Sequence, residues 1–393
     1  MHNGYSATFE CPGNIDFDIH GVVGIRLIDP SPRDFDAACK LLGQPSRRPL
    51  TMPDITVRFV KDLPVREMRL LGTDEDGFTG DGFFLLEKGT RRVRAQIPFD
   101  RIGEPCEIVC TSRIGSVPLL IPIVGLTVLK KGCIPIHASA VVYDGVGILM
   151  AGWAHCGKTS ALLGFASKGA EYVGEEWVLL GGNDQRMRGI VKPLELTHRQ
   201  VVSLPHRRSA VNFINRCVFG GIGVLCGFEK MIRGEAIQSN FLSRNLQRVS
   251  AGVEDRLRRA IEPSAIFQDR IRSAGSQVDK IFIFLSREEN RIDVEPISPF
   301  EMARCLTFLV QHELSPLLGH YCAYRFAFPG RRNEFIESTA EYSLAILTRA
   351  LHGKATYIVR LPYPHVFPEL LKALEPYCKP TAAPTAESIH ALA

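Results

Sequence analysis

The sequence predicts an α/β protein: a nucleotide-binding domain with a mixed sheet and a helical insertion, preceded by a mainly β N-terminal domain. The first observation is the run Gly152-Trp153-Ala154-His155-Cys156-Gly157-Lys158-Thr159, which has the glycine, Lys and Thr spacing of a phosphate-binding loop. An apolar run, 147–151, precedes it, and apolar residues at helical spacing follow it. The second is Asp144-Gly145 between two apolar runs, which predicts an antiparallel hairpin.

Short strand-like runs separated by turns make up residues 1–115, and they predict the mainly β N-terminal domain. These runs are 22–27, 54–60, 82–86 and 106–110. Residues 116–378 are expected to form the nucleotide-binding domain, which opens with an apolar and helical segment at 117–129. The Ala/Pro/Thr-rich tail, 379–393, is expected to be disordered.

The hairpin predicts where a histidine lies. If Asp144 and Gly145 form a two-residue turn, the numbers of paired residues sum to 289, and His137 lies beside Gly152. An antiparallel strand next to the loop strand is foreign to all-parallel nucleotide-binding sheets. His137 is therefore either a functional group at the mouth of the loop or a buried histidine satisfied by a backbone carbonyl.

The loop residues carry the predicted chemistry. The two glycines let backbone N–H groups turn toward a β-phosphate, and the positive end of the following helix adds to their effect. Lys158 would reach the β/γ oxygens, and the Thr159 hydroxyl would complete a Mg²⁺ shell made mostly of water and phosphate oxygens. We therefore expect residues 152–159, with Ser160, to bind ATP and Mg²⁺.

A strand is predicted at 172–180, with Glu175 and Glu176 in its first half. Together with His137 and the loop, this pair resembles the catalytic domain of the HPr kinase/phosphorylase family, over residues 132–180. That family has a histidine at the start of a hairpin before its loop and an Asp-Asp pair after it. Its fold is a mixed sheet with flanking helices, similar to the phosphoenolpyruvate carboxykinase core.

The resemblance implies an ATP-dependent kinase that phosphorylates a hydroxyl of a small molecule or a Ser of a peptide or protein. It implies that Glu175 takes the proton of the attacking hydroxyl with His137 nearby, that Lys158 serves catalysis, and that Glu176 joins Thr159 near the magnesium. Both glutamates stand where the family has aspartates, and Ser160 stands where a Glu is frequent. A nucleotide-binding switch or scaffold without phosphotransfer, and a nucleotide hydrolase, are the alternatives.

Residues 198–276 are expected to form a helical insertion rich in arginine. Between Arg199 and Arg272 there are 13 Lys/Arg and 6 Asp/Glu, an excess larger than the net charge of +5 for the whole chain. This local excess, including Arg256, Arg258 and Arg259, favours an anionic small-molecule or peptide acceptor. No aromatic residues interleave with the run from Arg256 to Arg259, so nucleic acid is not expected.

Composition limits the remaining classes of protein. Eleven cysteines, an odd number without repeated C-x-x-C pairs, argue against a disulfide framework and a structural zinc site. The longest apolar stretch is too short and too proline-rich for a membrane span, and no signal peptide is visible, so a cytoplasmic protein is expected. The sequence leaves open GTP in place of ATP, and also a homo-oligomer.

The C-terminal part is expected to alternate helices and strands. A strand is predicted at 280–285, and Ser298-Pro299-Phe300-Glu301 is a capping box for a helix through Leu309. A helix at 338–351, a strand at 355–361 and a last helix at 367–377 follow. Residues 328–333 resemble an Arg-containing loop of the same family.

Overall fold

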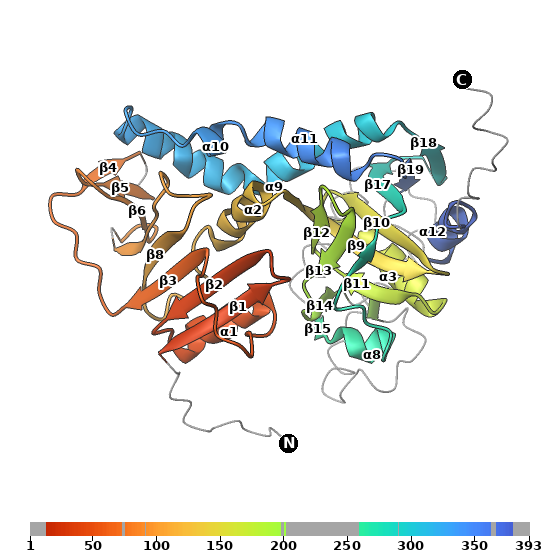
Figure 1. The fold of residues 1–393 in the computed structure, drawn as a ribbon, viewed down its shortest axis with the longest axis horizontal. Coiled ribbons are helices and arrows are strands. Elements are labelled where there is room, and N and C mark those ends of the chain that lie inside the picture. The colour runs from red at the N-terminus through yellow and green to blue at the C-terminus, as the bar shows by residue number, and fades with distance from the viewer. Residues whose placement is uncertain are drawn as a thin grey trace, which may run out of the picture.

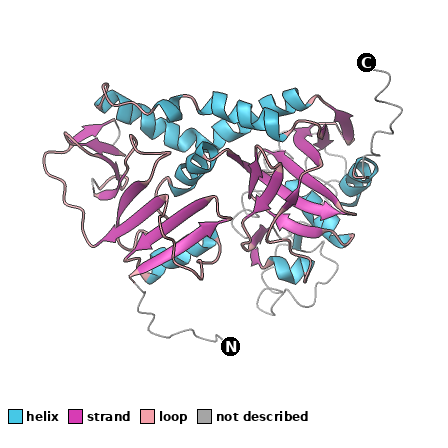
Figure 2. Cartoon of the chain, viewed as in Figure 1, coloured by secondary structure: helices cyan, strands magenta, loops and turns pink. Residues whose placement is uncertain are grey.

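The computed structural model describes residues 13–72, 75–90, 92–197, 200–201, 259–289, 291–362 and 367–379, which form a mixed α/β fold built on mixed sheets (Figures 1 and 2). Most of the expected insertion, with Arg256 and Arg258, lies outside these residues, as does the expected disordered tail beyond Lys379. The described end of the insertion is not purely helical, because strands flank a five-residue helix there.

The first large sheet contains the four strands that the sequence predicts in the N-terminal region, plus shorter ones. Among the described residues its order is β1 (Asn14–Ile19), β2 (Val23–Ile28), β3 (Ile55–Val60), β8 (Cys106–Thr111), β7 (Val93–Gln96), β6 (Phe83–Leu86), β5 (Asp76–Phe78) and β4 (Arg69–Leu71). Strands β2, β3 and β8 run parallel, and the others pair antiparallel. The helix α1 (Pro32–Leu42) connects β2 to β3 and begins with a capping box.

The second large sheet holds the glycine-rich loop. Its order is β16 (Ser276–Gln277), β13 (Arg186–Gly189), β12 (Trp177–Gly181), β9 (Cys133–Tyr143), β10 (Val146–Gly152), β17 (Lys280–Arg287), β19 (Ala355–Pro362) and β18 (Asp293–Pro296). A further short strand, β11 (Glu171–Gly174), also pairs with β9. Among the described strands of this sheet, β10, β17 and β19 run parallel and the other pairs are antiparallel, so the sheet is mixed, as predicted. A two-stranded sheet joins β14 (Leu194–Leu196) to β15 (Arg259–Ile261).

Helices join and cover the two large sheets. They are α2 (Leu120–Lys130), α3 (Lys158–Ser167), α8 (Pro263–Phe267), α9 (Pro299–Ala327), α10 (Glu334–Glu337), α11 (Thr339–Ala350), α12 (Phe367–Leu374) and the 3₁₀ turn η1 (Glu375–Tyr377). Figure 1 shows α9, α10 and α11 lying along the top of both sheets, with α2 between the sheets. One buried apolar cluster runs from Phe17 in β1 through Leu314 in α9 to Ile136 in β9, and a second packs α3 and α12 on the other face of the second sheet.

The long helix α9 corrects the expectation that this helix ends at Leu309. It begins at the predicted capping box, in which Ser298 accepts from the Glu301 N–H, and continues for 29 residues. Its later buried residues, Val310, Leu314, Leu317, Tyr321 and Tyr324, recur every three or four positions and keep an apolar face on the core. Burial of that face outweighs the helix-breaking tendency of Pro316, and α9 therefore reaches from one sheet to the other.

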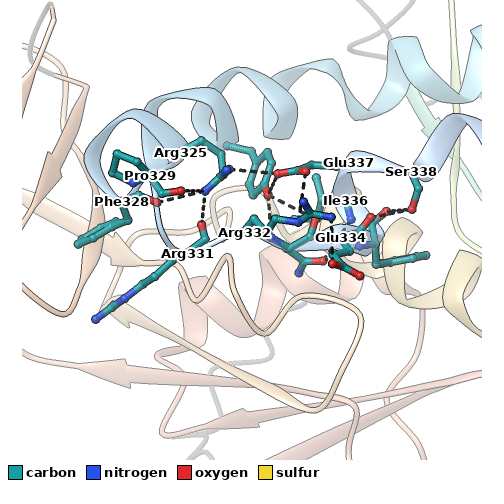
Figure 3. A network of polar contacts seen from close by, with 12 residues as sticks. Arg325, Phe328, Pro329, Arg331, Arg332, Glu334, Ile336, Glu337 and Ser338 are labelled. Carbon is teal, nitrogen blue, oxygen red and sulfur yellow. Dashed lines mark hydrogen bonds and ion pairs between the residues drawn. The ribbon is translucent and has the colours of Figure 1, made fainter.

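The turn after α9 fixes the helix to the first sheet (Figure 3). Arg325 donates to the carbonyls of Phe328, Pro329 and Arg331, at 3.2, 2.8 and 2.8 Å. The buried Asn333 caps α10 and donates to the carbonyls of Phe99 and Ile102. The bonds from Arg325 satisfy carbonyls of the turn, and those from Asn333 join the turn to the segment between β7 and β8.

Candidate functional site

The hairpin of β9 and β10 has the predicted register. Pairs from Val146 with Tyr143 to Ala151 with Ala138 all sum to 289, and Asp144 and Gly145 both have positive φ, at 48° and 78°. Two positive φ angles are what a type I′ hairpin turn requires, and Gly145 adopts its angle without strain. The next position in this register sets His137 opposite Gly152, where the glycine-rich loop begins.

The glycine-rich loop, residues 152–157, connects the end of β10 to the start of α3. Gly152 has φ 147°, and a Cβ there would lie 2.7 Å from both the Cys156 sulfur and the Phe284 carbonyl oxygen. Gly157, with φ 100°, is the N-cap of α3 and has no side chain to bond the first N–H groups of the helix. The loop thus folds tightly back on itself and leaves the helix N-terminus without a side-chain cap.

Lys158 is the first residue of α3, and its side chain points back into the glycine-rich loop. Its ammonium group donates to the carbonyls of Gly152 and Trp153, each at 2.7 Å, and its side chain is buried. The ammonium group is buried because the carbonyls of the loop surround it. A buried positive charge held by neutral carbonyls favours an anion beside it.

The carboxylate pair lies in a break between two strands, which corrects the prediction of one strand over 172–180. β11 ends at Gly174 and β12 begins at Trp177, while Gly174 pairs with Ala140 and Trp177 with His137. The register is the same on both sides of the break, so Glu175 lies opposite Ser139. Glu176 has φ 63° and turns the chain locally. The two carboxylates therefore have different partners.

Glu175 is a buried carboxylate that accepts two hydroxyl hydrogen bonds. Thr159 Oγ1 donates to its Oε1 at 2.5 Å, and Ser139 Oγ donates to its Oε2. Burial raises the pKa of Glu175, and the bonds from Ser139 and Thr159 and the charge of Lys158 offset only part of that shift. A carboxylate with a raised pKa, joined to the first turn of α3, has the properties of a general base.

Glu176 forms an ion pair with Lys192, which follows β13. The structure thus places Glu175, rather than Glu176, against Thr159.

Within the described part of the chain, no group of three or more His, Cys, Asp or Glu side chains could hold a metal ion. Mg²⁺ does not require such a group, because it keeps several waters and binds one or two protein oxygens together with phosphate. The hard oxygen donors around Thr159 fit that requirement.

Replacing Glu175 with Gln should stabilise the fold at neutral and alkaline pH. The pKa of Glu175 in the folded protein is raised above its ordinary value of 4.5. The free energy of unfolding is therefore not reduced by this carboxyl below the pKa that it has in the unfolded chain, and it falls as pH rises through the pKa of the folded state. We expect the Tm of Glu175→Gln to exceed that of the parent by about 2–4 °C at pH 8.5 in EDTA, with a smaller difference at pH 5.5. Equal melting temperatures at both pH values would contradict this assignment.

Helix α9 brings two residues to the site that no motif indicates. Glu313 Oε1 lies 2.9 Å from Nδ1 of His137, and the His312 ring packs edge-on against the Trp153 ring, with centroids 4.1 Å apart. The hydrogen bond from His137 lowers the pKa of Glu313 despite its partial burial, and the charges of His312 and Lys158 lower it further. The interpretation of His137 as bonded to a backbone carbonyl is therefore wrong for this ring nitrogen.

No model of a protein family matches the sequence, and no curated protein matches it. Among the described residues, no helix is long and apolar enough to cross a membrane.

The structure brings together His137, Lys158, Thr159 and Glu175, and it adds Ser139, Lys192 and Glu313. Ser139, two residues after His137 on β9, could have been found only with the register of β11 and β12. The arginine-containing turn at 328–333 is not part of this group, because the helix rises about 22 Å from His312 to Ala327. Arg259 lies in β15, at the edge of the undescribed segment.

Proposed function

We propose that the chain is an ATP-dependent phosphotransferase that moves the γ-phosphoryl group to a hydroxyl of a small molecule or of a peptide or protein Ser. The observation that carries this proposal is the contact of Glu175 with Thr159 directly beside Lys158. One buried base, one buried ammonium group and one hydroxyl meet where a strand passes through a glycine-rich loop into a helix. Phosphoryl transfer requires mainly positioning and charge neutralisation, which these groups supply.

Each residue has a defined part in this proposal. Lys158 and the first N–H groups of α3 bind the β- and γ-phosphates, and the other loop residues, Trp153 to Cys156 with Ser160, line the nucleotide. Glu175 takes the proton of the acceptor hydroxyl as its oxygen attacks phosphorus, and the electrons of the broken P–O bond leave with ADP.

Thr159 and Glu176 would hold Mg²⁺, which when bound neutralises charge on the β- and γ-phosphates. In the structure Glu176 also forms an ion pair with Lys192. Comparing Glu176→Gln with Glu175→Gln separates the two carboxylates. If Glu176→Gln alone abolished turnover, the roles of base and magnesium-side carboxylate would be reversed.

The resemblance to the HPr kinase/phosphorylase family and the mixed sheet with its antiparallel hairpin support a related fold and reaction. The excess of arginines between Arg199 and Arg272 in the sequence supports an anionic acceptor, and a cytoplasmic location would supply the ATP. The proposal is tested by incubating the protein with γ-labelled ATP and a fractionated metabolite and peptide extract. A new labelled phosphate ester supports transfer, labelled inorganic phosphate alone indicates a hydrolase, and stoichiometric binding without turnover indicates a switch.

Replacing His137 with Ala should lower turnover less than replacing Glu175, by about 10-fold, because His137 assists proton movement without being the main base. Nucleotide affinity should change little, since the loop carries the phosphate contacts. Single-turnover transfer from labelled ATP measures the effect. A loss as large as that of Glu175→Gln would mean that the histidine is the base.

A further inference from the structure

The contact between His137 and Glu313 joins two segments far apart in the sequence. Nδ1 of His137 lies 2.9 Å from Glu313 Oε1, and both side chains are mostly buried, with exposed fractions of 24% and 33%. Apolar side chains from β9 and α9, among them Ile136, Val310 and Leu314, line a pocket around the pair. Low polarity around a charge-assisted hydrogen bond strengthens it. The ring orientation of His137 is therefore fixed by α9.

The same turn of α9 also contacts the glycine-rich loop. His312 packs on Trp153, and the Lys158 charge acts on the Glu313 carboxylate. Because residues two apart on a strand point to the same face, His137 lies on the face of β9 that carries Ser139, about 7 Å farther along the strand. Ser139 bonds Glu175. Glu313 thus acts on a histidine that neighbours both the base and the loop.

An imidazole in its neutral form carries its proton on one nitrogen only. A carboxylate can only accept, so Glu313 selects the tautomer of His137 with the proton on Nδ1 and leaves the lone pair on Nε2. We propose that Glu313 is a positioning residue of the phosphotransfer site, which fixes the ring and tautomer of His137 so that Nε2 accepts a hydrogen bond from the acceptor hydroxyl. This inference rests on the proposed function. Nε2 takes this single proton as the oxygen bonds to phosphorus and passes it to Glu175, the final acceptor, which returns His137 to the Nδ1–H tautomer.

Two variants test this role in the full chain. Glu313→Leu removes the acceptor, whereas Glu313→Gln keeps a neutral acceptor oxygen at the same reach. Replacing the exposed Glu341 of α11 with Leu is the matched control for loss of a surface carboxylate. The tautomer is read from two-bond ¹H–¹⁵N correlations of ¹⁵N-histidine-labelled protein at a pH where His137 is neutral, with His137→Gln assigning the signals.

In the parent and in Glu313→Gln we expect the Nδ1–H tautomer, and in Glu313→Leu a shift toward Nε2–H. Turnover should fall about 10-fold or more in Glu313→Leu, stay within about 3-fold in Glu313→Gln and be unchanged in Glu341→Leu, with equal Mg-ATP affinity throughout. An Nε2–H tautomer in the parent, or parental turnover in Glu313→Leu, would overturn the inference while the kinase proposal stands. A parent protein without phosphoryl transfer would refute the proposed function, and the catalytic role of Glu313 with it.

Discussion

Glu175→Gln should lower phosphoryl transfer by about 10²–10⁴-fold while leaving ATP affinity nearly unchanged. Gln has almost the same shape as Glu, and its amide can still pair with the hydroxyls of Ser139 and Thr159, which now bond the carboxylate. What the variant lacks is a group that can accept the proton of the acceptor hydroxyl. Single-turnover kinetics with saturating Mg-ATP measure this loss directly.

The higher Tm expected for Glu175→Gln makes its kinetic result decisive. A variant that is more stable than the parent and inactive cannot owe its inactivity to unfolding. The matched control is Glu171→Gln on β11, because Glu171 is a partly exposed carboxylate that pairs with Arg272 and does not contact the loop. Full turnover in Glu175→Gln would exclude this residue as the base.

Lys158→Met should abolish stabilisation of the fold by Mg-ATP. Methionine retains most of the buried volume, whereas the ammonium group that would contact the β- and γ-phosphates is lost. In the parent, a nucleotide concentration 100 times the Kd should add about 2.7 kcal/mol to the free energy of unfolding, and in the variant the gain should be close to zero. Differential scanning calorimetry with and without Mg-ATP measures both.

The control for Lys158→Met is Lys168→Met at the other end of α3. The Lys168 side chain is half exposed and lies 3.8 Å from Glu375, so its loss removes a surface charge from the same helix. It should keep the full stabilisation by Mg-ATP. If Lys158→Met and the parent gained equal stability, the loop would not be the nucleotide site.

Local patterns in the sequence predicted much of the site. The Asp144-Gly145 turn fixed the register of the hairpin and thereby the place of His137, because a two-residue turn leaves one pairing. The sequence also predicted the order of strand, glycine-rich loop and helix. The strand is a continuous apolar run, the loop has its two spaced glycines, and the helix has apolar residues at helical spacing. Strands β2, β3, β6 and β8 were predicted within one or two residues for the same reason.

The parts that the sequence did not predict depend on contacts between distant segments. Gly174 stands at the break between β11 and β12, but one glycine in an apolar run does not show that the strand stops there, and the positive φ of Glu176 is set by pairing on both sides with β9. The burial of Lys158 depends on how the loop closes around it. Glu313 comes from a helix that continues past a proline because its far half packs on the core. The spacing of apolar residues within one segment does not predict such contacts between distant segments.

The measurement that tests the central claim most directly is equilibrium dialysis of the purified chain against labelled ATP, because it does not require the acceptor. The account predicts one ATP bound per chain, with binding that weakens in EDTA and is lost in Lys158→Met but kept in Lys168→Met. Absence of ATP binding by the parent, or equal binding by Lys158→Met, would contradict it.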